Sequence, residues 1–431
     1  MDTSLKIFNE LDFNVLMNFD TITIVLGAIT LFIALIAPLF TPFFRFRSIL
    51  NQIQKKESQQ KTDVDTLNSS IENVEGLMHD TPPMGNQTTE ESETLSSITI
   101  LLTVQQQAEE LQKHLPIFLS QEYNGHYQVV IVCDEGDVDT ENLLKQYQGD
   151  PRLYYTFVPS SSRYMSRKKL AITIGVKAAK YDWIIMADAN SAPVSKHWLQ
   201  SMASVCLNER NLILGYSNYL PEAKKYYQLE HLYFELYFLR KAYKGTAYTT
   251  RSRNLAFRKS YFIHEDGFRG NLNLIRGEYD FIVNKFAKPS STALQIDKNA
   301  WIMEDIPNKK AWMNKHLYYL ETRKYLQRSS TMRFCFNSDM LVLHFSYLII
   351  LASIVYAVLL SNWLLTIISV IALLVLMLLH VLCSRKTMKY FLPHISVFRI
   401  IPFEVLIIWH QLIYYIRYKC VNKYDFSSHK L

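Results

Sequence analysis

The placement of apolar residues constrains this chain most, because they are pooled near its two ends. Residues 21–44 carry no charge, and a helix rising about 1.5 Å per residue needs roughly 20 such residues to cross a bilayer core. Arg45, Arg47 and Lys55 follow directly. Since basic flanks stay on the cytoplasmic side, we predict that residues 1–20 lie outside and the rest inside.

Two further membrane helices are predicted near the C-terminus, at residues 340–360 and 363–383. Only Ser361 and Asn362 separate these apolar spans, so they form a helical hairpin that leaves the cytoplasm and returns.

The last apolar segment, residues 395–418, contains Arg399, Glu404 and His410. Ionisable residues are costly inside a bilayer, so we favour a helix lying in the interface over a full crossing. A crossing would also export the basic tail at 419–431, against the charge rule.

The middle of the chain divides into a polar segment and a regular one. Residues 45–96 are rich in Gln, Ser, Thr, Asn and Glu and predict a flexible linker. Residues 97–330 alternate strand-like and helical patterns. We expect strands at 98–103, 127–133, 153–158 and 182–186, with helices at 108–119, 139–146 and 168–179. This alternation predicts an α/β domain with a mostly parallel sheet, whose ligands bind beyond the carboxyl ends of the strands.

Charge and cysteine content exclude several classes of function. The formal net charge of +7 over 431 residues suits an anionic membrane surface or phosphate handling, and it falls short of a nucleic-acid-binding excess. The five cysteines include no C-x-x-C pair, so neither a zinc site nor a disulfide framework is indicated.

Acidic residues follow two of the predicted strands. Asp134 and Glu135 come after the strand at 127–133, where a carboxylate can bind a base or a ribose, although Asp-rich turns also serve the backbone alone. Asp188 and Asn190 follow the strand at 182–186. Their oxygens could hold Mg²⁺ or Mn²⁺, or simply cap the helix that follows.

A third acidic pair, Glu278 and Asp280, begins a predicted helix. A carboxylate here could act as a general base, or it could only favour the helix dipole. Lys168 and Lys169 precede another predicted helix and could contact phosphate, or form a solvated basic face.

Together, residues 97–326 resemble the bacterial family-2 glycosyltransferases of the GT-A fold, and most of all the membrane-bound subset of the Bacteroidetes. The matching stretches are SITILLTVQQQAEEL, LPIFLSQEYNGHYQVVIVCDEGDVDT, KKLAITIGVKAAKYDWIIMADANSAPVSKHWL, RNLAFRKSYF and RGEYDFIVN. The third is the most specific, because its Lys-Lys pair, helix, strand, acidic turn and Trp-Leu all stand in the family's order.

The resemblance implies a role for each candidate residue. Asp134 with Glu135 would hold the nucleotide, and Lys169 would lie near the diphosphate. Asp188 and Asn190 stand on the D-x-D motif that carries Mg²⁺ or Mn²⁺. Glu278 and Asp280 stand on the acidic cluster that supplies the catalytic base, and we prefer Asp280.

Three acidic positions of that family pattern are neutral in this chain. Gln106-Gln107 replaces Asn-Glu after the first strand, Asn190 replaces the second Asp of D-x-D, and Tyr279 interrupts the last acidic cluster. These departures predict either weak metal binding or a degenerate relative that serves as a membrane scaffold.

The resemblance implies an inverting hexosyltransferase of the bacterial inner membrane, with its catalytic domain in the cytoplasm. It would transfer sugar from a UDP- or GDP-sugar to a lipid-linked acceptor in cell-envelope polysaccharide biosynthesis. Membrane lipids are expected partners, and nucleic acid is not. A processive polysaccharide synthase is the nearest alternative, but the chain lacks its Gln-x-x-Arg-Trp motif, with only Trp312-Met-Asn-Lys-His316 in its place.

Overall fold

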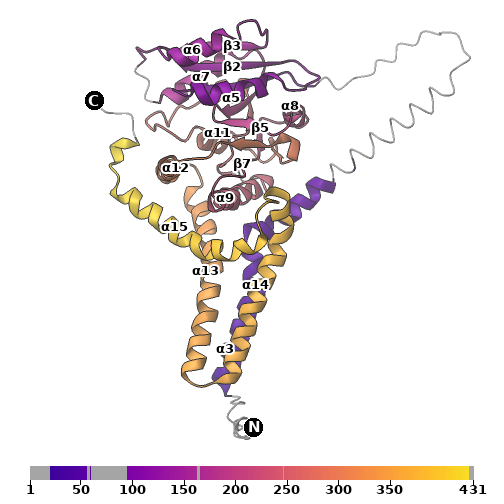
Figure 1. The fold of residues 1–431 in the computed structure, drawn as a ribbon, viewed down its shortest axis with the longest axis vertical. Helices are drawn as coiled ribbons and strands as arrows, with labels where there is room; N and C mark the ends of the chain where they lie inside the picture. Colours follow the sequence, from indigo (N-terminus) through magenta and orange to yellow (C-terminus); the bar gives the residue numbers. More distant parts are fainter. Residues whose placement is uncertain (1–19, 56–58, 60–94, 163–165, 246, 427–431) are drawn as a thin grey trace, which may run out of the picture.

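A computed structural model describes residues 20–55, 59, 95–162, 166–245 and 247–426, and shows an α/β domain above a bundle of long helices (Figure 1). The expected fold is confirmed: a mixed α/β domain with a mostly parallel sheet, and membrane-type helices at both ends. The N-terminal segment, most of the predicted linker and the end of the basic tail lie outside the described residues.

The main sheet has seven strands in the order β3-β2-β1-β4-β8-β6-β9. These strands are β1 (Ile98–Val104), β2 (Tyr127–Asp134), β3 (Leu153–Val158), β4 (Trp183–Asp188), β6 (Leu212–Gly215), β8 (Leu255–Arg258) and β9 (Thr292–Gln295). β1 to β4 are parallel, whereas β8 runs antiparallel to β4 and β6. The register pairs Thr103 with Asp188, so the ends of β1 and β4 meet at one edge.

Helices pack around this sheet, and the first three match the sequence prediction closely. The helices of the domain are α5 (Ala108–Leu119), α6 (Val138–Lys145), α7 (Arg167–Ala178), α8 (Trp198–Ala203), α9 (Lys225–Tyr243), α10 (Lys259–His264), α11 (Glu278–Phe286) and α12 (Lys309–Thr322), with a 3-10 turn η2 (Lys298–Ala300). Strands β1 and β2 are buried on both faces, as expected when helices cover both sides of a parallel sheet.

A second sheet of three short strands, β5 (Ser191–Pro193), β10 (Ile302–Glu304) and β7 (Ser217–Tyr219), was not predicted. Strands of three residues carry too little periodicity to be recognised in a sequence. The sheet pairs Glu304 with both Ser191 and Tyr219. It therefore brings a carboxylate from late in the chain beside the end of β4.

Four helices are long and apolar enough to span a membrane, one near the N-terminus and three near the C-terminus, which indicates a membrane protein. They comprise α3 (Thr21–Ile36) with the turn η1 (Ala37–Phe40), α13 (Ser329–Leu359), α14 (Trp363–Phe391), and η3 (Val397–Arg399) with α15 (Ile400–Cys420), which a final turn η4 (Lys423–Asp425) follows. α13 begins earlier than predicted and α14 ends later. Polar residues outside the apolar spans simply continue the two helices toward the domain.

The last helix, α15, is oriented differently from the others. α3, α13 and α14 run side by side, whereas α15 runs crosswise at the base of the α/β domain and contacts α9 and α12 (Figure 1). Its Glu404 is buried, accepts a 2.6 Å hydrogen bond from Thr41 and lies 2.7 Å from His380. Glu404, whose charge disfavours a membrane crossing by this segment, thus has protein partners and is shielded from the surroundings.

The predicted linker begins later than residue 45. Residues 42–55 are helical, and Phe46, Ile49 and Leu50 are buried in the main core. Phe46 packs edge-on against Phe391 of α14, with 6.0 Å between ring centroids. These apolar side chains, spaced at three and four residues, attach the helix to the core. The prediction missed this helix because it rested on the polar composition of the whole segment.

Candidate active site

A cavity of about 640 Å³ lies where the carboxyl ends of β1 and β4 meet α11, α12 and the second sheet. Its lining is polar and carries charges of both signs. Among its residues are Thr103, Gln105, Gln107, Lys168, Asp188, Asn190, Arg251, Arg253, Arg276, Glu278, Tyr279, Asp280, Glu304, Asp305, Lys315 and Tyr319. This is the edge at which an α/β sheet binds its ligands.

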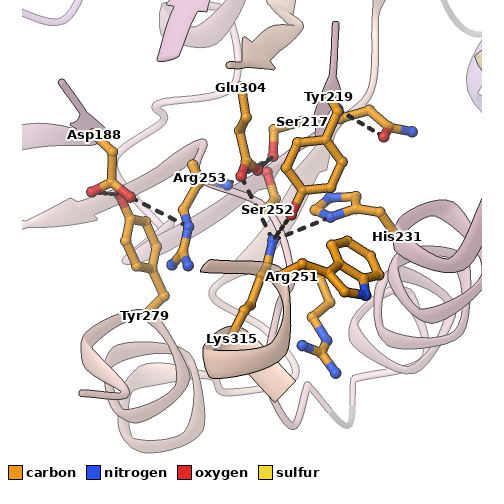
Figure 2. Close-up of polar contacts among 12 residues, drawn as sticks. Asp188, Ser217, Tyr219, His231, Arg251, Ser252, Arg253, Tyr279, Glu304 and Lys315 are labelled. Carbon is orange, nitrogen blue, oxygen red and sulfur yellow. Dashed lines mark hydrogen bonds and ion pairs between the residues drawn. The ribbon is translucent and has the colours of Figure 1, made fainter. Parts of the chain in front are cut away.

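Asp188 is the last residue of β4 and lies between two cationic side chains, of which Figure 2 shows Arg253. Lys168 Nζ is 2.8 Å from Oδ1, and Arg253 Nε is 3.3 Å from Oδ2. The hydroxyl of Tyr279 also donates to Oδ1 at 3.2 Å. Burial alone would raise the pKa of Asp188, but Lys168 and Arg253 outweigh it and hold the pKa below its usual value. Asp188 is therefore an ionised carboxylate.

The side chains present do not form the predicted metal site. Both oxygens of Asp188 already face cations, and Asn190, which also lines the cavity, is neutral. No three His, Cys, Asp or Glu side chains in the described part of the chain are grouped to hold a metal ion. A divalent cation at Asp188 would have to displace Lys168 and Arg253.

The acidic pair on α11 reaches the cavity as the sequence predicts. α11 starts at Glu278 after Gly277, which has φ of 98°. A Cβ on Gly277 would lie 2.5 Å from Thr322 of α12, so the left-handed turn and the tight packing both require glycine. This turn fixes Glu278, Tyr279 and Asp280 against the cavity.

The two carboxylates differ in their surroundings. Asp280 accepts a hydrogen bond from the hydroxyl of Thr249, and burial raises its pKa. Glu278 is 4% exposed, and its Oε1 has no hydrogen-bond partner. A raised pKa suits proton abstraction, which favours Asp280 as the base, whereas Glu278 presents an unsatisfied acceptor.

Lys169, predicted to contact a diphosphate, does not reach the cavity. It is fully buried, and its Nζ donates to the carbonyls of Asn271 (2.6 Å) and Leu274 (2.8 Å). Burial lowers its pKa to about 8. The neighbouring Lys168 lines the cavity instead, because successive residues on a helix point about 100° apart. Lys169 holds the loop that leads into α11.

Asp134 ends β2 at the same sheet edge and Glu135 follows it, but neither lines the cavity. Asp134 Oδ1 accepts hydrogen bonds from the guanidinium of Arg167, at 2.9 Å to Nη2. Glu135 is exposed and accepts one from the backbone of Ser160 at 2.6 Å. The structure thus places the predicted nucleotide-binding pair beside the cavity, with the carboxylate of Asp134 already paired with Arg167.

Several cavity residues were missed from the sequence, chiefly Arg253, Glu304 and Lys315. Lys315 Nζ lies 2.6 Å from the hydroxyl of Tyr219 and 3.6 Å from Glu304 (Figure 2). Burial lowers the pKa of Lys315 to about 8, although Glu304 opposes the shift. Arg253 opens one of the stretches that carry the resemblance, but nothing local indicates that it pairs with Asp188.

A comparison with protein families supports a glycosyltransferase. The model described as Glycosyl transferase family 21 matches residues 70–269, which include β1 to β4 and Asp188. The match ends before α11, so it does not cover Glu278, Asp280 or Lys315. No curated protein sequence matches the chain significantly.

Solved structures with a similar fold share little sequence with this chain. The mannosyltransferase PcManGT from Pyrobaculum calidifontis, in complex with GDP-Man and Mn²⁺, is 12% identical, with a TM-score of 0.49 over 84% of this chain and 99% of its own. TarS 1–349 of S. aureus in complex with UDP-GlcNAc is 10% identical, with a TM-score of 0.38 over 58% and 71%. GalNAc-T7 with UDP, GalNAc and Mn²⁺ is 12% identical, with a TM-score of 0.36 over 52% and 47%. The chain is thus similar to glycosyltransferase family 21 over residues 70–269, while membership of family 2 and a bacterial origin are not confirmed.

Proposed function

We propose that this chain is a membrane-bound glycosyltransferase that moves a sugar from a UDP- or GDP-sugar to a lipid-linked acceptor. The observation that carries the proposal is the arrangement of charges in the large cavity. Lys168, Arg253 and Arg276 line it together with Glu278 and Asp280. Cations can bind a diphosphate while a carboxylate takes a proton, which is what transfer from a nucleotide sugar requires.

In the proposed reaction, the acceptor oxygen forms a bond to the anomeric carbon on the face opposite the diphosphate. The bond from that carbon to the diphosphate oxygen breaks, and the acceptor's proton passes to Asp280. The configuration at the anomeric carbon is inverted. Lys168 and Arg253 stabilise the charge that develops on the leaving diphosphate, and Tyr279 holds Asp188, which in turn orients both cations.

We further propose a location in a bacterial inner membrane, with the α/β domain in the cytoplasm and a role in cell-envelope polysaccharide synthesis. The charges that flank the membrane helices support the orientation. Arg45 and Arg47 follow the first span, and Arg385 and Lys386 lie at the domain end of α14. Basic residues next to a bilayer stay on the cytoplasmic side. The α/β domain would then face cytoplasmic nucleotide sugars and take its acceptor from the membrane.

The first test is thermal protection of the full chain in detergent by a panel of UDP- and GDP-sugars. A ligand that binds the native state raises the melting temperature by mass action. We expect one donor class to protect the wild type but not Arg253→Ala, and that donor then to support transfer. Arg269→Ala is the matched control, because Arg269 is exposed and pairs with Asp266 at the surface.

Protection by no donor would contradict the proposal. It would favour instead a catalytically degenerate membrane scaffold, which the pairing of Asp188 with two cations also allows. Transfer of many sugars per acceptor would favour the processive synthase.

A further inference from the structure

A second cavity, of about 340 Å³, lies at the base of the domain between α9, α12, α13 and α15. Most of its lining is apolar, for example Phe234, Phe336 and Leu412. Two arginines, Arg323 and Arg333, interrupt that lining. A pair of cations in an otherwise apolar cavity needs an explanation, because desolvated charge is costly without a partner.

Among the described residues, no carboxylate lies within ion-pair distance of Arg323 or Arg333. Arg323 Nε is buried without a hydrogen-bond partner, and Arg333 Nε donates only to the carbonyl of Ser329, at 3.3 Å. Burial, followed by the like charge of Arg333, lowers the pKa of Arg323. An anion between two guanidiniums that repel each other would relieve this repulsion.

The cavity reaches the surface where a lipid chain would lie. Leu341 of α13, Leu412 of α15 and Tyr415 of α15 line it, and each is more than 40% exposed. α13 continues from this point as a membrane-type helix, and α15 crosses it at the base of the domain (Figure 1). An apolar chain could therefore leave the cavity along exposed side chains without crossing polar protein.

The second cavity also adjoins the larger cavity that contains Asp188 and Asp280. Tyr319 of α12 lines both, and the guanidinium of Arg251 lies over its ring, 4.2 Å from the centroid. Residues 248–251 run between the two cavities. Tyr248 lines the second cavity, Arg251 lines the cavity that contains Asp188, and Thr249 donates a hydrogen bond to Asp280. A group that extends past Tyr319 would approach the proposed base.

We propose that Arg323 and Arg333 bind the phosphate of a lipid whose apolar chain leaves between α13 and α15. The shared chemistry is a phosphate or diphosphate joined to a hydrocarbon chain, with the part to be glycosylated directed past Tyr319 toward Asp280. The proposal deepens the proposed function and rests on it, because it assigns the acceptor's anchoring site.

The test measures binding of farnesyl phosphate to the full chain in detergent, beside farnesol and inorganic phosphate. We expect farnesyl phosphate to bind best, since farnesol lacks the anion and inorganic phosphate lacks the chain. Loss of each charge-assisted contact should weaken farnesyl phosphate by roughly tenfold in Arg323→Ala and in Arg333→Ala. Arg323→Lys should restore part of the binding, because it returns the charge.

Arg417→Ala is the control, since Arg417 is an exposed cation on α15 that attracts anionic lipid without lining the cavity. Equal weakening by Arg417→Ala, or equal binding of farnesol, would overturn the proposal, as would stronger binding of inorganic phosphate alone. Donor protection separates the two hypotheses. If Arg323→Ala keeps donor protection but loses farnesyl phosphate binding, both hypotheses are supported. If the wild type shows donor protection but binds farnesol as well as farnesyl phosphate, only the acceptor site is refuted.

Discussion

The ammonium of Lys168 lies 2.8 Å from the carboxylate of Asp188, on the side of that carboxylate opposite Arg253. In sequence, Asp188 and Asn190 are typical of a metal site. In the structure, protein cations take that place, and Tyr279 completes the shell with a hydrogen bond at 3.2 Å. The three neutralised acidic positions therefore fit a donor site whose positive charge comes from side chains.

This arrangement predicts that donor binding survives removal of divalent cations. With EDTA, the melting-temperature shift caused by the preferred nucleotide sugar should stay within error of its value in Mg²⁺ or Mn²⁺. Arg253→Ala should weaken the donor by roughly tenfold or more, because it loses a charge-assisted contact. Titration calorimetry of the donor measures both effects. Complete loss of donor binding in EDTA would show instead that the donor site depends on a divalent cation.

Asp280→Asn should abolish transfer but not donor binding. Removing a general base costs roughly 10²- to 10⁴-fold in rate, while the cationic donor side remains. Since burial raises the pKa of Asp280, the wild-type rate should fall as pH drops through that raised value, because the protonated acid cannot accept a proton. A pH–rate profile of kcat tests this. A larger rate loss in Glu278→Gln would move the base to Glu278.

Glu235 should make stability depend on pH near neutrality. It is buried on α9 and accepts hydrogen bonds from the backbone N–H groups of Arg251 and Ser252, and burial raises its pKa to about 7. Because that value exceeds the unfolded one, the folded state binds the proton more tightly. The stabilising effect is fully present below the unfolded pKa of about 4.3, and it is lost as pH rises to about 7.

Glu235→Gln should therefore gain stability relative to wild type between pH 5 and pH 8, by on the order of 3 kcal/mol at most. Thermal melts at the two pH values measure the difference. Glu209→Gln, an exposed position, should show no such trend, and an equal trend in both variants would mean that Glu235 is not the titrating group.

Lys168 and Lys169 are adjacent in sequence but should respond differently to substitution. Lys169→Ala removes two hydrogen bonds to buried carbonyls, each costing about 1–3 kcal/mol when left unmade, so the melting temperature should fall by several degrees. Lys168→Ala should lower the melting temperature less, because Asp188 keeps its contact with Arg253, and it should weaken donor binding. The reverse pattern would show that Lys169 contacts the donor as the sequence predicts.

The crosswise orientation of α15 predicts that the C-terminus stays on the domain side of the membrane. Cys420 is exposed at the end of α15, so a membrane-impermeant thiol reagent should miss it in intact cells and label it after lysis. Ser361→Cys, in the turn between α13 and α14, should be labelled in intact cells because the proposed orientation places that turn outside. Labelling of Cys420 in intact cells would establish a fourth crossing.

Local pattern fixed much of the fold and part of the site. Alternating apolar runs gave β1 to β4 and α5 to α7 nearly to the residue, because burial on both faces and helical spacing leave strong signals. Asp188 reaches the cavity as expected, since it ends a strand of a parallel sheet, and Glu278 and Asp280 reach it from the first turn of α11. The length of the apolar segments likewise predicted the membrane helices, although α13 and α14 extend beyond those segments into polar sequence.

Tertiary structure decided everything that depends on partners far apart in the chain. The turn at Ser166 that caps α7 sets whether Lys168 or Lys169 faces the cavity, a difference of about 100° that no composition reveals. Arg253 and Lys315 reach the site only because β8 turns antiparallel and α12 folds back over the sheet. Arg323 and Arg333, which have no acidic partner among the described residues, likewise share a cavity only because α13 and α15 pack against α12. Periodicity reports the burial of single elements, whereas charge pairing depends on contacts between elements.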